Sequence, residues 1–219
     1  AAETPQFWPA AVIAVAGFMA IGAVGRALDA QLLQHLSVPG LIASGAALFF
    51  GEEAASRWRF PLGFLFFMTP IGAVAEPLLQ TLAANGADVL LALGGVDANL
   101  DGLTITTAAG AFFIAPSCAG LRYLLCAAIV ATLFSHERLS AWSDRFAFIA
   151  AAAVAAVIAN AIRIAAIIAA AEHNAAFRAR LDDHAFVGWI VFAILMIALA
   201  VFGYALADRR LAQARAVAA

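Results

Sequence analysis

The chain has 219 residues, of which 65% are hydrophobic and 12% are charged, and its mean hydropathy is +0.97. A soluble domain is about half apolar and about a quarter charged, so this composition indicates a protein embedded in a lipid bilayer. The net charge is -2 and the chain contains no lysine, which excludes a basic surface for nucleic acid.

Apolar segments follow one another along the chain at residues 7–28, 36–51, 60–93, 118–135, 146–171 and 184–207. About 20 helical residues cross a hydrocarbon core of about 30 Å, so this pattern predicts about six spans. The first segment lacks the basic leader of a signal peptide and is expected to be a retained helix. The fold class that we predict is all-α, a polytopic transmembrane helical bundle formed by one domain over residues 1–219.

The third segment is too long for one helix and contains Pro70 and Pro77. Each proline removes a backbone donor and kinks or ends a helix. We therefore expect a span that ends at about Ala75, followed by an interfacial helix over residues 78–93.

Arginine placement predicts the orientation. If residues 52–59, 136–145 and 208–219 are cytoplasmic, they hold seven arginines, against three in the outer segments. This predicts a multi-pass protein of the cell (inner) membrane whose outer face receives the loop 95–117. Two apolar runs in that loop flank Ala108-Ala109-Gly110, which predicts a short extracytoplasmic β-hairpin.

Arg163 is the strongest candidate for a functional residue. An arginine within a spanning helix costs about 2.5–3.5 kcal/mol even on the lenient insertion scale, so it is expected to face a polar interior. Asn160 lies one turn earlier on the same face, where it could orient the guanidinium or merely join two helices.

Cys118 is the candidate nucleophile, because Pro116-Ser117 before it suits a helix start. A helix N-terminus and a nearby cation, here Arg122, both favour a thiolate. Cys126 lies eight residues later, about 12 Å along a helix, which is too far for a disulfide with Cys118. We expect it to be a packing residue.

His184 opens the last apolar segment directly after Asp183. A carboxylate there could hold one ring nitrogen while the other nitrogen exchanges a proton. Thiol, base and cation are together the parts of acyl transfer. No metal and no cofactor are expected, because the zinc-protease-like and calcium-loop-like segments each lack a required ligand.

Three stretches resemble the exosortase and archaeosortase family of membrane-embedded cysteine transpeptidases. They are residues 102–114 leading into Pro116-Ser-Cys-Ala-Gly-Leu-Arg122, then Asn160-Ala-Ile-Arg-Ile164, and then His184-Ala-Phe-Val-Gly-Trp-Ile-Val-Phe192. The resemblance is strongest over residues 61–207. Ala119 departs from the small hydroxyl residue that commonly follows the family's cysteine.

The resemblance implies that Cys118, Arg163 and His184 are catalytic. Arg122, Asn160 and Asp183 are auxiliary candidates because of their positions beside these residues. The resemblance also implies that the protein cleaves C-terminal sorting signals, similar to PEP-CTERM tails, from exported proteins. A Cys118 thioester would then pass each protein to an amine or a lipid-linked acceptor.

Two other functions stay open from the sequence. An intramembrane cysteine protease that only hydrolyses would use the same residues. A small transporter with Arg163 as its anion site would be expected to show two repeated halves with broken helices.

Overall fold

The computed structural model describes residues 9–69, 72–174 and 185–218, and the chain divides into two units, Ala1–Ala73 and Val74–Ala219. Five helices among the described residues are long and apolar enough to cross a membrane. They are Ala10–Ala27, Gln31–Gly51, Pro116–Arg138, Trp142–His173 and Phe186–Arg210. The predicted polytopic helical bundle is thereby confirmed.

The third expected span differs from the prediction. It consists of the short helix α3 (Arg59–Phe64) and the 3₁₀ helix η1 (Leu65–Met68), which together reach only about 15–20 Å. The helix ends because Thr69 is extended, with φ -78° and ψ 128°. A proline disfavours the helical conformation at the residue before it, and Pro70 follows Thr69. The described residues therefore contain five helices that are both long and apolar enough to cross a membrane, and not six.

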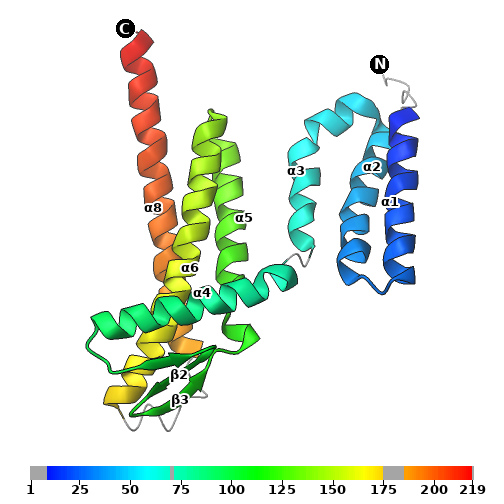
Figure 1. The fold of residues 1–219 in the computed structure, drawn as a ribbon. Coiled ribbons are helices and arrows are strands. Elements are labelled where there is room, and N and C mark those ends of the chain that lie inside the picture. Colours follow the sequence, from blue (N-terminus) through cyan, green and yellow to red (C-terminus); the bar gives the residue numbers. More distant parts are fainter. Residues whose placement is uncertain (1–8, 70–71, 175–184, 219) are drawn as a thin grey trace. The chain divides into compact units, whose positions relative to one another are not determined.

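The first unit contains a hairpin of two long helices, α1 (Pro9–Ala27) and α2 (Gln31–Arg57) (Figure 1). Asp29 makes the turn in the left-handed conformation, at φ 51°, which aspartate tolerates better than most residues. The Gln34 side-chain amide closes the turn by donating to the Gly25 carbonyl at 3.0 Å. α2 is kinked at Gly51, where φ is 80°, and the second predicted span ends at the same residue.

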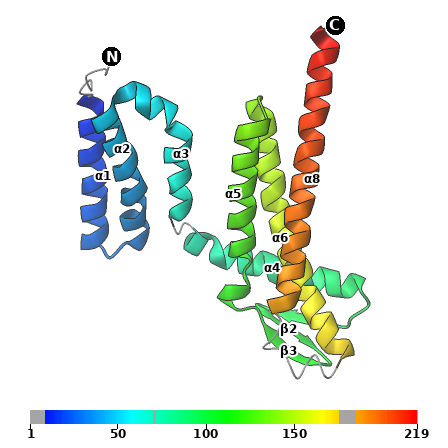
Figure 2. The same cartoon turned by 180° about the vertical axis from the view of Figure 1, so that it is seen from behind.

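The second unit contains a three-helix bundle of α5 (Leu121–Arg138), α6 (Trp142–His173) and α8 (Ala185–Ala218) (Figures 1 and 2). Small side chains spaced by four residues form its buried ridges. They are Ala127 and Ala131 on α5 and Ala152 and Ala156 on α6, each at most 1% exposed. Residues four apart form one ridge on a helix, and small side chains let helix backbones approach closely in lipid.

At one end of this bundle, α4 (Gly72–Leu93) lies across the long helices, next to a small sheet (Figures 1 and 2). The sheet has antiparallel strands β1 (Asn99–Asp101), β2 (Thr104–Thr107) and β3 (Gly110–Phe113), in the order β1-β2-β3. Strands β2 and β3 form the predicted hairpin, and β1 is an addition to it. α4 begins earlier than the expected residue 78 and contains Pro77 in its interior.

The length of α6 relates these parts to the bilayer. Its 32 residues extend about 48 Å, whereas the hydrocarbon core is about 30 Å thick. α4 crosses α6 where a Cβ on Gly86 would lie 2.8 Å from the Ala161 side chain, about 28 Å along the helix from Trp142. α6 is therefore longer than one crossing of the hydrocarbon core needs, and α4 and the sheet pack against its second half.

Charged side chains gather at the other end of the bundle. Arg210 of α8 pairs with Asp144 of α6 at 2.5 Å, and the Arg145 Nε donates to the Leu139 carbonyl at 2.7 Å. Arg138 of α5 lies over an aromatic ring of α8, 5.5 Å from its centre. These contacts join the three helices at the level where α6 begins.

The close packing of α8 against α5 and α6 yields a stability prediction. A Cβ on Gly203 would lie 2.9 Å from the ring of Phe134 and 3.0 Å from that of Phe148. Gly203→Val should therefore destabilise the bundle, by about 1–3 kcal/mol, the usual cost of overpacking a core. Thermal unfolding in detergent, followed by circular dichroism, measures this effect. Ala200→Val at an exposed position of the same helix is the control, and equal melting temperatures for the two variants would contradict the packing.

Candidate functional site

Cys118 lies between the sheet and the bundle. It ends a 3₁₀ turn, η2 (Pro116–Cys118), and α5 begins at Leu121. The cysteine therefore precedes the helix N-terminus and is not the first helical residue that the sequence indicated. Cys118 is half-buried and its thiol is free.

Gly120 gives the chain the sharp bend that brings Cys118 onto α6. Its φ is 89°, in the left-handed region that glycine adopts without strain. A Cβ at this position would lie only 2.6 Å from the side-chain amide of Asn160. Glycine is thus required twice, for its conformation and for the space that Asn160 fills.

Asn160 connects Cys118 with Arg163. It is 2% exposed, and its Nδ2 donates to the Cys118 carbonyl oxygen at 2.9 Å. Its Oδ1 faces the guanidinium of Arg163, with the Nη1 of Arg163 donating at 3.5 Å, a long hydrogen bond. One buried amide therefore joins the two residues that the sequence had singled out on different segments.

The guanidinium of Arg163 is packed against the start of α8. Its Nε is buried and has no hydrogen-bond partner among the described residues. A Cβ on Gly188 would lie 3.1 Å from this nitrogen, so glycine permits the approach. An unpaired buried donor is costly in a protein interior, and at this place it is available to an acceptor that enters the site.

Tyr123 fixes the other side of the same junction. Its hydroxyl donates to the Gly188 carbonyl at 2.5 Å, and its ring meets Phe192 edge-on at 5.6 Å between centroids. The first turn of α5 is thereby attached to the first turn of α8. Neither Tyr123 nor Gly188 was identified from the sequence, although a glycine within a spanning helix often marks a close backbone approach.

Two polar contacts hold the sheet from which the chain runs to Cys118. The Gln80 side chain of α4 donates to the Ile114 carbonyl at 3.1 Å, four residues before Cys118. At the far end of the hairpin, Glu172 of α6 accepts from the Thr107 hydroxyl and from the Ala109 amide, both at 2.8 Å. The segment that carries the cysteine is thus fixed to both α4 and α6.

The other sequence candidates stand apart from this arrangement. Arg122 is exposed, and no hydrogen bond or ion pair joins it to another site residue that the structure describes. Cys126 lies eight residues further along α5. His184 and Asp183 fall outside the described residues, and α8 begins at the next residue, Ala185.

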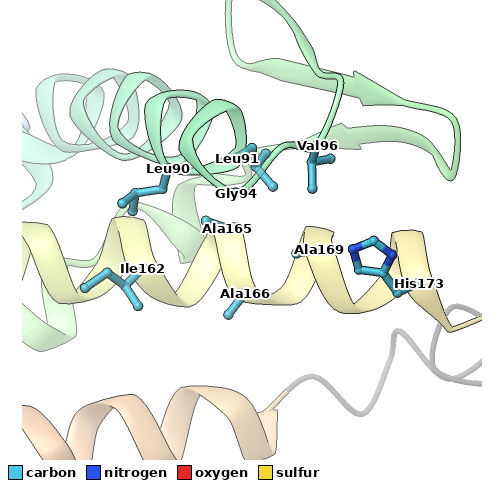
Figure 3. Close-up of a pocket in the computed structure, with 9 residues that line it drawn as sticks. All are labelled: Leu90, Leu91, Gly94, Val96, Ile162, Ala165, Ala166, Ala169 and His173. Atoms are coloured by element: carbon cyan, nitrogen blue, oxygen red, sulfur yellow. The ribbon is translucent and has the colours of Figure 1, made fainter.

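A separate apolar cavity of about 270 Å³ lies between the end of α4 and the outer half of α6 (Figure 3). On α6 it is lined by Ile162, Ala165, Ala166 and Ala169, with His173 at one end. At 100° of rotation per residue, this face points about half a turn away from Asn160. The cavity is therefore not part of the Cys118 site. No cluster of metal-ligating side chains occurs among residues 9–69, 72–174 and 185–218.

The site lies about one hydrocarbon thickness along the helices from the charged end of the bundle. Arg163 is about 31 Å along α6 from Trp142, and Gly188 is about 30 Å along α8 from Asp208. Each distance matches the hydrocarbon core of about 30 Å. Asn160 links the backbone of a thiol residue before a helix N-terminus to a guanidinium with an unpaired donor. Such a pair can attack a carbonyl group and stabilise the resulting oxyanion.

Comparison with known proteins identifies the family. The family model described as transmembrane exosortase matches residues 1–201. No curated protein and no solved structure matches the chain. The matched region covers nearly the whole chain and includes both membrane surfaces of the bundle. The chain therefore belongs to the transmembrane exosortases, a family of multi-pass membrane enzymes of protein sorting.

Proposed function

We propose that the protein is a cysteine transpeptidase that cleaves the C-terminal sorting signals of exported proteins. The observation that carries this proposal is the buried amide of Asn160, which bonds the Cys118 carbonyl and faces the Arg163 guanidinium. The amide thus holds both the backbone of Cys118 and the guanidinium of Arg163, which is the cation of the proposed site.

In the proposed reaction, the Cys118 thiolate attacks the carbonyl carbon of the scissile peptide bond. The carbonyl oxygen becomes an oxyanion, and the guanidinium of Arg163, whose Nε is unpaired, stabilises it. The C–N bond then breaks, and His184 delivers the proton to the leaving amine. This leaves a thioester between Cys118 and the substrate, together with a released hydrophobic tail.

A second nucleophile resolves the thioester. An amine or a lipid-linked acceptor attacks the same carbonyl carbon and gives up a proton to His184, the C–S bond breaks and the thiolate returns to Cys118. Water in bulk is about 55 M, so transfer requires a site that excludes water or orients the acceptor far better. A site at the membrane surface favours an acceptor that diffuses in the bilayer.

The substrates in this proposal are exported proteins that end in a short motif, a hydrophobic helix and a basic tail. The depth of the site suits such a tail, because the motif leaves the bilayer at the level of Arg163. The active site faces the extracytoplasmic side, since the arginines at the other end of the bundle favour the cytoplasm.

The first prediction concerns the nucleophile. Cys118→Ala should abolish the processing of substrate tails, because no other thiol lies at the site. Cys126→Ala, which removes the second cysteine of α5, should process normally and is the matched control. Processing is measured by the mobility of a tagged substrate in cells, and normal processing by Cys118→Ala would end the proposal.

The mass of the new C-terminus on processed substrate distinguishes transfer from hydrolysis. An added acceptor supports the transpeptidase. A bare carboxylate on every molecule would assign the same residues to a protease.

The second prediction concerns the guanidinium. Arg163→Lys keeps the charge but loses the planar fork of donors, so it should insert normally and lose about 10²–10³ in turnover. Arg122→Lys is the control, because Arg122 is exposed and is joined to none of the described site residues. Near-normal turnover by Arg163→Lys would show that a simple charge suffices and that the oxyanion role is wrong.

The third prediction concerns the side of the membrane. A membrane-impermeant maleimide added to spheroplasts should label Cys118 in a Cys126→Ala background, since Cys118 is half-buried at the outer surface of the bundle. The Cys118→Ala variant retains only Cys126, within the span, so its labelling measures the background reaction of the maleimide. Labelling of Cys118 only after the cytoplasmic face is opened would reverse the topology.

A further inference from the structure

α4 has a second apolar face that no described part of the second unit covers. One face packs on α6 and the sheet, with Ala83, Ala84 and Leu91 at most 1% exposed. The opposite face presents four large apolar side chains, which we call the α4 stripe. They are Leu78 at 62%, Leu82 at 44%, Val89 at 57% and Leu93 at 80% exposed.

The spacing of the stripe follows the helix. At 100° per residue these residues fall within an arc of about 60°, and the buried residues lie on the other side of the helix. A soluble helix with one packed face carries polar residues on the other. α4 is instead apolar on two faces, which indicates that its outer face also lies in an apolar medium.

The exposed polar side chains beside the stripe are also compatible with an apolar medium. The Thr81 hydroxyl donates to the Pro77 carbonyl at 3.0 Å, and the Asn85 amide donates to the Thr81 carbonyl at 2.8 Å. Each of these exposed side chains places a donor on the backbone of α4 itself. Such local hydrogen bonds lower the cost of placing a polar side chain in lipid.

The depth of α4 identifies the medium. α4 crosses α6 at Ala161, about 28 Å from Trp142, which is one hydrocarbon thickness from the charged end of the bundle. α4 lies across the spanning helices (Figures 1 and 2). A helix in this position runs along the membrane plane when the long helices cross the membrane, and the distance of about 28 Å puts it near the edge of the hydrocarbon core. α4 contains no arginine, lysine or histidine, so attraction to anionic headgroups does not hold it there.

We infer that the α4 stripe is seated in the acyl chains at the outer edge of the bilayer and is covered by lipid, not by protein. This inference rests on the membrane depth of the bundle and does not depend on the proposed reaction. It has a consequence for the site. Gln80, on the packed side of α4, holds the Ile114 carbonyl four residues before Cys118, so the seating of α4 sets the depth of the cysteine.

Spin labels test the inference directly. Single cysteines replace Leu82 and Val89 in a Cys118→Ser, Cys126→Ser background, carry a nitroxide and are reconstituted in phosphatidylcholine vesicles. Ile158, which is 52% exposed in the middle of α6, is the lipid reference, and Asp101, exposed in β1, is the water reference. Collision rates with oxygen, which partitions into lipid, and with a nickel chelate, which stays in water, are measured at each position.

Positions 82 and 89 should resemble 158, with high oxygen and low nickel accessibility, and added anionic lipid should not change them. Higher nickel than oxygen accessibility would show that the stripe faces water. Low accessibility to both would show that protein covers it, either the first unit or a second copy. Each of these two results overturns the inference.

A measurement on the unaltered chain guards against variants that fail to fold. Phosphatidylcholine with a photoreactive diazirine at the end of an acyl chain is incorporated with the wild-type protein and irradiated, and the lipid adducts are located by mass spectrometry. Adducts are expected on α4 as well as on the lipid-facing side of α6. Adducts on α6 with none on α4 would reject the inference.

Discussion

The structure of the second unit depends on one constraint, which is that α6 is longer than the bilayer is thick. Its 32 residues extend about 48 Å, and the hydrocarbon core takes about 30 Å of that length. The part within the core packs against α5 and α8 through alanines, and the part beyond it carries α4 and the sheet. Asn160 and Arg163 lie where the two parts meet.

Asn160 determines which groups come together at this boundary. A buried amide must find partners for its polar atoms, because an unsatisfied group costs about 1–3 kcal/mol. It finds one in the carbonyl of Cys118, which is reached only because Gly120 lacks a side chain and adopts a positive φ. The sheet brings the preceding residues to the same place, with Gln80 and Glu172 as its polar anchors. The cysteine is therefore held by contacts with α4, α6 and its own backbone.

The sequence predicted the parts of this fold that depend on local pattern. The spanning helices follow from apolar length, and the β2–β3 hairpin follows from its turn residues. The sequence also separated Cys118 from Cys126 and placed Asn160 and Arg163 on one face of a helix. It overestimated the span before Pro70, where the conformation of Thr69 ends the helix early. Tyr123, Gly188 and Glu172 act through contacts more than 60 residues apart in the chain, which no local pattern reveals. The role of His184 stays a prediction, because it lies outside the described residues.

The central claim is that Cys118 becomes covalently attached to the substrate, and mass spectrometry of the enzyme during turnover tests it most directly. We expect the peptide that contains Cys118 to carry an adduct with the mass of the substrate segment that ends at the cleavage point. Neutral hydroxylamine should remove this adduct, as it removes a thioester. An adduct on Cys126, or continued turnover after Cys118 carries a bulky irreversible alkyl group, would contradict this claim.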